Sequence, residues 1–322
     1  MSDDRYEQVL DKLADDSEPL SGLPLEALSN LSREAKAELD DLWPSISVDK
    51  RRLLVAKLTD LGDDDFHLDF SAVFRRGLYD VDAEVRRLSI DGLWEHEHVT
   101  LVRPFLRLLE DESPEVQASA ASALGRFVLQ GELGQLTMER FQEIVSRLLA
   151  LTDDVAVPTA VRRRAIESLA YSSDPELRGI IARAYEDPDD RMRQSAIFAM
   201  GRSADEYWRG QVRAELSSDE AAFRFEAARA AGELADPKAV ASLARLLADE
   251  EIGVREVAIW SLGQIGGAQA RRALQIFIEQ DESELAEQAR DALAEMALLE
   301  GDLTTPFLGD SLFEGEDDDD DA

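Results

Sequence analysis

The feature that most constrains the fold of this chain is a repeat of 31 residues. In its clearest copy, residues 187–202, an acidic turn precedes an apolar residue (Met192), an arginine (Arg193), a small residue (Ala196), a second apolar residue (Met200) and a glycine. Seven leading apolar positions can be aligned, and five of the six intervals between them are 31 residues. They are Val85, Val116, Val161, Met192, Phe223, Val254 and Leu285. A fixed period in this range is typical of solenoids, whose units cannot bury their apolar faces alone.

Two further columns of the repeat lie on the same helical face as the leading apolar residue. The first holds small residues that let neighbouring helices approach closely: Ser89, Ala120, Ala165, Ala196, Ala227, Ala258 and Ala289. The second, four residues later, holds mostly large ones: Leu93, Leu124, Leu169, Met200, Ala231, Leu262 and Leu293. This alternation predicts helix packing through one continuous core.

These columns resemble HEAT repeats, and in particular the phycobilisome-lyase-type HEAT-like repeats, over residues 65–299. The resemblance implies an all-α fold, a right-handed α-solenoid of HEAT-like helical pairs with a period of about 31 residues. Members of this group include adaptors, scaffolds, bilin lyases, a di-iron hydroxylase and relatives of DNA glycosylases. The resemblance is therefore specific for fold and much less so for function.

We expect four segments along the chain. They are an N-terminal helix and linker at 1–31, an N-terminal capping helical pair at 32–64, the HEAT-like repeat array at 65–301 and an acidic disordered tail at 302–322. In the capping pair, Ser47 predicts a helix start and Gly62 a helix end. The one interval of 45 residues contains 14 inserted residues, which we place in a loop at 131–137 and a longer turn at 152–158.

The charge balance limits the partners of this chain. It has 35 basic and 69 acidic residues and a net charge of −34, which opposes nucleic acid and anionic lipid and favours basic partners. It has no cysteine, so disulfides and thiolate sites are excluded. No apolar run approaches the roughly 18 residues of a membrane span, and no signal peptide is recognisable at the start. We therefore expect a cytoplasmic protein without contact to nucleic acid or membrane.

Three groups of residues could carry chemistry, and each has a simpler interpretation. The arginines that follow the leading apolar residues accompany turn acids such as Asp187 and Asp249, which predicts an internal ladder of ion pairs. His96 and His98 stand two residues apart in a helix-end cluster, which predicts no shared metal. The His-Glu dipeptides of the di-iron hydroxylases are missing, and only Glu226 matches. We therefore predict no metal, no cofactor and no catalytic residue.

The resemblance implies that one side of the second helix in each unit faces a concave surface. That side carries arginines interleaved with aromatic residues, the types that dominate protein interfaces. The residues that we predict to bind a partner are Arg163, Arg164, Tyr171, Phe198, Arg202, Phe225, Arg229 and Trp260. In the opposing interpretation the aromatics fill gaps between units, and the arginines are solvated or pair with Glu167, Glu226 and Glu233.

The sequence thus favours a non-catalytic scaffold or adaptor that binds a protein partner on this Arg/aromatic surface. The partner segment would be extended or helical, and acidic or mixed in charge. In one variant of this hypothesis the chain's own acidic tail competes for the surface. The alternative function is a bilin-lyase-like or chaperone-like protein acting on a tetrapyrrole-bearing protein, with Tyr171, Phe198 and Trp260 lining a pocket.

Overall fold

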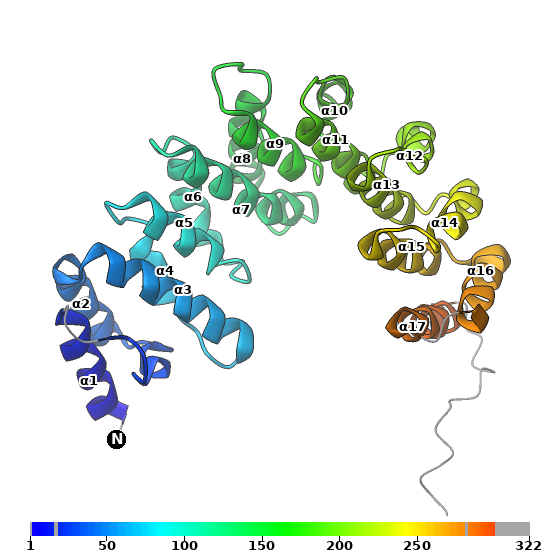
Figure 1. Cartoon of the computed structure of the whole chain (residues 1–322). Coiled ribbons are helices and arrows are strands. Elements are labelled where there is room, and N and C mark those ends of the chain that lie inside the picture. Colours follow the sequence, from blue (N-terminus) through cyan, green and yellow to red (C-terminus); the bar gives the residue numbers. More distant parts are fainter. Residues whose placement is uncertain (1, 16–18, 281–282, 300–322) are drawn as a thin grey trace, which may run out of the picture. The chain divides into compact units, whose positions relative to one another are not determined.

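The structure is a computed structural model of the chain, and it describes residues 2–15, 19–280 and 283–299 (Figure 1). Within these ranges it contains 17 α-helices, five short 3-10 helices and no β-strand. The chain divides into two compact units, residues 1–199 and 200–322. The expected all-α fold is confirmed, and the tail predicted at 302–322 lies outside the described residues.

The first unit begins with helices that precede the repeats. They are α1 (Ser2–Ala14), η1 (Leu25–Leu28), α2 (Arg33–Leu42), η2 (Trp43–Ser45) and α3 (Val48–Asp64). Ser32 begins α2, because its hydroxyl accepts a hydrogen bond from the Ala35 N–H at 3.1 Å. The Tyr6 hydroxyl joins α1 to α2 by donating to the Ala35 carbonyl at 2.7 Å. The N-terminal helix is thus packed against the helices that follow it.

Four helical pairs then follow, each with a first and a second helix. They are α4 (Ser71–Gly77) with α5 (Ala83–Asp91), η3 (Val99–Leu101) and α6 (Val102–Leu108) with α7 (Pro114–Glu132), α8 (Met138–Thr152) with α9 (Thr159–Leu169), and α10 (Leu177–Tyr185) with α11 (Asp190–Arg202). The second helices of successive pairs are neighbours, α5 beside α7 and α7 beside α9 (Figure 1). They carry the packed columns of the repeat.

The second unit repeats this arrangement in three pairs. They are η4 (Glu206–Trp208) and α12 (Arg209–Glu215) with α13 (Ala221–Glu233), η5 (Pro237–Ala239) and α14 (Val240–Leu246) with α15 (Ile252–Ile265), and α16 (Gly267–Gln280) with α17 (Glu284–Leu299). The α13, α15 and α17 helices pack in sequence against one another. Asp205 and Asp236 start the first two pairs by accepting backbone hydrogen bonds two residues on, which favours a 3-10 turn before the α-helix.

The burial of the repeat columns confirms that they form the core. No leading apolar residue is more than 4% exposed, and every residue of the small column has no exposed surface. The large column is equally buried from Leu93 to Leu262, whereas Leu293 in the last helix is half-buried. The 31-residue period therefore marks the residues that neighbouring helices share.

Two predicted boundaries are wrong. The α3 helix continues through Gly62 to Asp64. The repeat array, expected from residue 65, has its first helix only from Ser71, because the preceding segment is held by the N-terminal part. There the Asp69 N–H donates to the Ser29 hydroxyl at 2.9 Å, and the Asp69 carboxylate accepts from the Ser71 N–H at 2.8 Å.

The 14 inserted residues are added mainly as helical turns and only partly as loops. The α7 helix has 19 residues and passes through Gly131, and α8 has 15. A Cβ atom on Gly131 would lie 2.1 Å from the Phe141 ring, so this glycine lets α8 pack closely on the end of α7. The connection between them is short, and the predicted longer turn at 152–158 lies between α8 and α9.

The predicted arginine ladder forms at some repeats. Arg86 holds the Asp111 carboxylate through two hydrogen bonds of 2.7 Å, and Arg224 holds Asp249 at 2.7 and 2.8 Å. In both pairs the acid lies 25 residues after the arginine, in the turn of the next repeat. The bonds therefore connect adjacent repeats.

Other positions of the ladder are weaker. Arg162 lies 4.0 Å from Asp187, and its Nε donates instead to the Thr152 carbonyl at 3.1 Å. Arg193 lies 3.2 Å from Asp190 of its own helix. The ladder is thus a property of particular repeats, and an acid 25 residues on does not by itself ensure a close pair.

Candidate functional site

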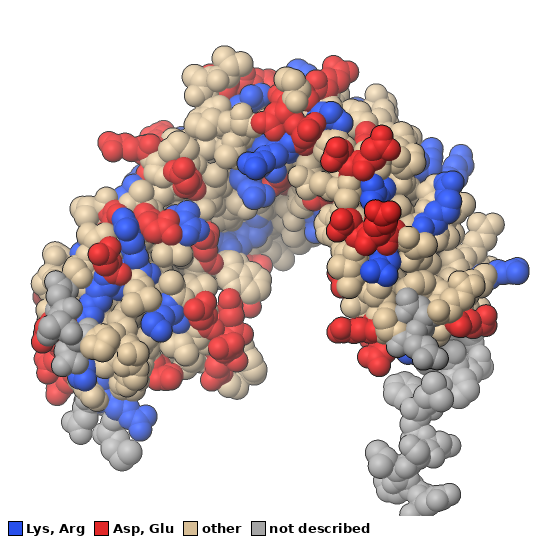
Figure 2. Space-filling view, in the orientation of Figure 1, with Lys and Arg blue, Asp and Glu red and all other residues tan. Residues whose placement is uncertain are grey.

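The second helices of the first unit form a groove of about 590 Å³ over α5, α7 and α9. Its floor consists of small residues of α7: Ala118, Ser119, Ser122 and Ala123. Around it stand Trp94, which is 58% exposed in the turn after α5, and four arginines: Arg87, Arg126, Arg163 and Arg164. Figure 2 shows basic side chains gathered over α7 and α9.

The groove is narrow because α7 and α9 approach closely. The Ser168 hydroxyl donates to the Ala121 carbonyl at 2.8 Å, so a side chain on α9 bonds directly to the backbone of α7. A Cβ atom on Gly125 would lie 3.3 Å from the Ser168 Cα. Small residues on both helices therefore bring the arginines of α9 beside the floor of the groove.

Arg126 is the most unusual cation in the groove. Its guanidinium lies 5.5 and 5.3 Å from the ring centres of Phe105 and Phe127, and one amino group donates to the Trp94 carbonyl. Its Nε and Nη2 atoms are buried without a hydrogen-bond acceptor. Burial lowers the pKa of Arg126 to about 10, so the side chain is still charged at neutral pH.

Arg163 and Arg164 share one carboxylate. Arg164 lies 2.5 Å from Glu167, and Arg163 lies 3.8 Å from it and donates to the Ser195 hydroxyl at 2.9 Å. Ser195 in turn donates to Glu167 at 2.6 Å. One carboxylate thus serves two guanidinium groups, and this end of the groove, with Arg126, has more positive than negative charge.

The opposite wall of the groove carries more acid than base, because one arginine faces two carboxylates. Arg87 binds Glu84 at 2.7 and 2.8 Å and Asp91 at 2.6 Å. Burial raises the pKa of Asp91, although the adjacent guanidinium opposes this. The cationic end of the groove therefore lies at α7 and α9.

The second unit contains the remaining predicted arginines in a compact network on α11 and α13. Arg229 binds Glu226 at 2.7 Å and Glu233 at 2.7 Å, and Arg202 lies 3.2 Å from Glu233. Burial raises the pKa of Glu233, and one of its oxygens is buried without a hydrogen-bond donor. The charges are balanced, because two arginines face two glutamates.

The predicted aromatic residues differ in exposure. Trp260 is 41% exposed, and its ring lies over Gly232 of the neighbouring helix. Tyr171, Phe198 and Phe225 are half-buried. The aromatics thus serve partly as spacers between helices, as the opposing interpretation requires, while Trp260 keeps an accessible face.

Of the eight predicted binding residues, the groove contains two, Arg163 and Arg164. Tyr171 and Phe198 lie elsewhere in the first unit, and the other four lie in the second. The predictions missed Arg87 and Arg126, although these stand two and ten residues after Val85 and Val116, at the same offsets as the predicted residues. The same pattern applied to the first two copies identifies them.

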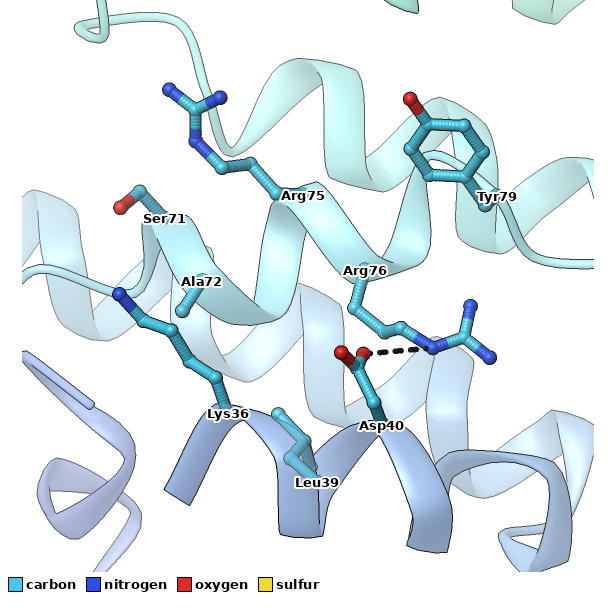
Figure 3. Close-up of a pocket in the computed structure, with 8 residues that line it drawn as sticks. All are labelled: Lys36, Leu39, Asp40, Ser71, Ala72, Arg75, Arg76 and Tyr79. Carbon is cyan, nitrogen blue, oxygen red and sulfur yellow. Dashed lines mark ion pairs between the residues drawn. The ribbon is translucent and has the colours of Figure 1, made fainter. Parts of the chain in front are cut away.

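A pocket of about 630 Å³ between α2 and α4 also contains cations (Figure 3). There Arg76 turns toward Asp40, at 3.2 Å, whereas Arg75 and Tyr79 point away from α2. The Arg75 guanidinium donates to the Thr100 hydroxyl at 3.0 Å. The Lys36 ammonium interacts electrostatically with a nearby carboxylate, that of Asp69. These cations each have a polar partner, whereas two guanidinium nitrogens of Arg126 have no acceptor.

Within the described ranges, no group of three or more His, Asp or Glu side chains is placed to hold a metal ion. None of the helices described in the structure is long and apolar enough to cross a membrane.

A family model of HEAT repeats matches residues 72–154 and 211–294, which together make up more than half of the chain. The chain belongs to the HEAT-repeat family. The two matched stretches of this HEAT-repeat protein fall one in each compact unit, and each includes two or more of the helical pairs described above. The family predicted from the 31-residue columns is confirmed.

Three solved structures are similar to this HEAT-repeat protein. The complex of CpcE and CpcF of phycocyanin lyase from Nostoc sp. PCC7120 has 18% identity over 70% of this chain and 94% of the other, with a TM-score of 0.48. Human deoxyhypusine hydroxylase in complex with glycerol has 19% identity over 82% and 96%, with a TM-score of 0.36. Importin beta has 13% identity over 92% and 47%, with a TM-score of 0.47.

These identities and TM-scores are too low to assign an activity or a partner to this HEAT-repeat protein. No curated protein matches its sequence.

Proposed function

We propose that this HEAT-repeat protein is a non-catalytic scaffold or adaptor, and that the groove over α5, α7 and α9 binds a protein segment with acidic side chains. The observation that carries the proposal is Arg126. Two of its guanidinium nitrogens are buried without an acceptor, and they lie beside an open groove. Unsatisfied buried donors cost free energy, and a carboxylate that reaches them recovers it.

Trp94 supports a protein ligand over a small anion. It is exposed along the groove wall and offers a large apolar surface beside the cations. Tryptophan and arginine together are the residues most enriched at the centres of protein interfaces. The groove also has a floor of small side chains, which leaves room for a backbone in extended or helical form.

Six of the eight residues predicted from the sequence have different roles in this proposal. Arg163 and Arg164 share a single glutamate and have capacity for a second carboxylate. Arg202, Phe225, Arg229 and Trp260 form a separate surface of the second unit, at which we also propose partner contact. Trp260 is the strongest candidate there, because its exposed face is not covered by the described residues.

The groove can be tested with a photo-reactive amino acid at Ser122, an exposed residue of its floor. Irradiation of the full chain in lysate of its source should cross-link one protein at an Asp- or Glu-rich segment, identified by mass spectrometry. Arg126→Gln with Arg164→Gln should lower the cross-link yield by about tenfold or more, because two charge-assisted contacts are lost.

The matched control carries the photo-reactive group at Ser146, which is exposed on α8 outside the groove. That variant should not capture the same segment. A second control, Arg103→Gln, changes an exposed arginine of α6 that does not line the groove, and it should leave the Ser122 cross-link unchanged. Equal capture from both positions, or capture that survives the double substitution, would contradict the proposal.

The alternative of a bilin-lyase-like or chaperone-like protein gives a different result. It predicts visible absorbance in the purified chain, or a change in the spectrum of an added bilin. A bilin bound with one-to-one stoichiometry and released by Trp260→Ala would favour that alternative over the scaffold.

A further inference from the structure

The arginine ladder lacks its acid at one repeat of the second unit. Arg255 occupies the ladder position that Arg224 occupies one repeat earlier, but the residue 25 positions on is Gln280. Arg224 forms two hydrogen bonds to Asp249 at this position. For Arg255 the structure gives no hydrogen bond or ion pair within the described residues, and its Nε is buried without an acceptor.

A pocket of about 520 Å³ lies where the missing carboxylate would be. It opens between α14 and α16, and Arg255 contributes to its lining. Its walls include Leu247, Ile276 and Phe277, and Arg272 adds a second cation. None of the described residues that line this pocket is acidic, in a chain that has 69 acids.

The described acid that interacts electrostatically with Arg255, Asp249, is already engaged. Asp249 accepts two hydrogen bonds from Arg224, and these hold its pKa below the usual value, with a smaller contribution from Arg255. The Asp249 carboxylate therefore interacts with Arg255 electrostatically, without a hydrogen bond. The next acids along the chain, Asp281 and Glu282, lie outside the described residues.

We infer that this pocket is a second binding site, which takes a carboxylate side chain flanked by bulky apolar residues. The carboxylate binds the Arg255 guanidinium in the two-bond geometry that Arg224 uses for Asp249, and the flanking residues pack on Leu247, Ile276 and Phe277. A planar guanidinium fork fits a carboxylate bidentately, and apolar walls strengthen the pair by excluding water. The site is independent of the groove over α5, α7 and α9.

Two sources of this chemistry exist. One is a partner protein, which is the occupant we propose, and the other is residues 307–313 of this chain (FLGDSLF), where Asp310 stands among phenylalanines and leucines. Those residues lie outside the described ranges, so the site is argued from Arg255 and its pocket alone. The experiment must therefore separate binding from a partner and binding from the chain itself.

The test uses a fluorescein-labelled peptide of residues 306–313 with an amidated C-terminus, so that Asp310 is its only peptide carboxylate. A second peptide has Asp310→Asn. The full chain should bind the Asp peptide at least about tenfold more tightly than the Asn peptide in fluorescence anisotropy, because a charge-assisted pair is lost. Equal affinity for the two peptides, or no binding of either, would overturn the proposal.

Two substitutions in the full chain identify the site. Arg255→Gln should remove the discrimination between the peptides. Gln280→Asp should do the same by a different route, because it restores the ladder acid and occupies Arg255 from within the chain. Arg245→Gln is the control: this arginine is exposed on α14, binds Ser242 at 2.9 Å and does not line the pocket. The proposed site would be wrong if Arg255→Gln still bound the Asp peptide more tightly than the Asn peptide, or if Arg245→Gln lost this difference in affinity.

Two further variants separate the sources. In a full chain with Asp310→Asn, tighter binding of the added peptide shows that the chain's own segment occupies the pocket, and unchanged binding assigns the pocket to a partner. In a chain with Asp281→Asn, peptide binding should equal that of the unsubstituted chain. If only the Asp281→Asn chain binds the peptide, Asp281 closes the pocket and the proposal fails.

Discussion

Arg224 and Asp249 join two successive repeats of the second unit through two parallel hydrogen bonds, Nε to Oδ2 at 2.7 Å and Nη2 to Oδ1 at 2.8 Å. The side chains are only 17% and 6% exposed, so water and salt screen the pair weakly. Asp249 also accepts from the Glu251 N–H at 3.1 Å, and Arg224 donates to the Ser218 carbonyl at 2.9 Å. One arginine thus fixes its own turn and the next one.

We expect Arg224→Gln to lower the free energy of unfolding by about 1–3 kcal/mol, because it leaves the Asp249 carboxylate without its charged donors. The matched control is Arg255→Gln at the same position of the next repeat, where no acid is paired. That change should cost less than about 0.5 kcal/mol. Urea unfolding followed by circular dichroism measures both, and equal losses would show that the ladder does not stabilise the array.

The buried pair of Arg51 and Asp80 should contribute more to the free energy of unfolding than the pair of Arg224 and Asp249. Both residues are buried, their side chains lie 2.9 Å apart, and the Trp43 indole donates to Asp80 at 2.6 Å. Removing one partner of a buried pair strands the other charge, so Asp80→Asn should cost about 3–5 kcal/mol. The control is the exposed pair of Arg76 and Asp40, where Asp40→Asn should cost less than about 1 kcal/mol. Thermal melts of the two variants should differ clearly, and similar melting temperatures would contradict this ranking.

Asp82 should make the junction between α3 and α5 sensitive to acid. Hydrogen bonds from Arg52, at 2.6 and 2.8 Å, are the main reason that the pKa of Asp82 falls to about 2. Since an unfolded aspartate has a pKa of about 3.9, the unfolded chain binds more protons between these values. The stabilisation is therefore complete above about pH 4 and is lost as the pH falls through about 2.

An Asp82→Asn variant lacks this titration. Its melting temperature should lie below that of the unsubstituted chain at pH 5, and the gap should close as the pH falls from 4 to 2. Asp49→Asn, at a side chain that is 96% exposed, should show little gap at any pH. A gap for Asp82→Asn that stays constant over this range would contradict the assigned pKa.

The sequence predicts the fold well because the residue type in each repeat column is set by local packing between neighbouring helices. Val85, Ala120 and Leu124 are buried as their positions in the repeat require. The same columns are buried in α15, at Val254, Ala258 and Leu262. Helix boundaries are less predictable where distant residues decide them, as at Asp69, which the Ser29 hydroxyl holds outside α4.

The candidate sites are less predictable, because a side chain's partners depend on helix packing as well as on spacing. Arg87 and Arg163 both stand two residues after the leading apolar residue of their copy, yet they meet different partners, Glu84 with Asp91 in one case and Ser195 with Glu167 in the other. The burial of Arg126 between two phenylalanine rings follows from the packing of α6 on α7, which no spacing in the sequence reveals.

The glycines of the repeat give a final prediction, because two of them sit in different surroundings. A Cβ atom on Gly232 of α13 would lie 2.9 Å from the Ser261 Cα and 2.8 Å from a carbon of the Trp260 ring. Gly232→Ala should therefore force α13 and α15 apart and cost about 1–3 kcal/mol, although alanine favours the helix. A Cβ on Gly253 of α15 would meet nothing closer than 3.9 Å, so Gly253→Ala should stabilise by up to about 1 kcal/mol. Opposite shifts of melting temperature would confirm that Gly232 sets the distance between α13 and α15. Shifts of the same sign would show that helix propensity determines the stability of both variants.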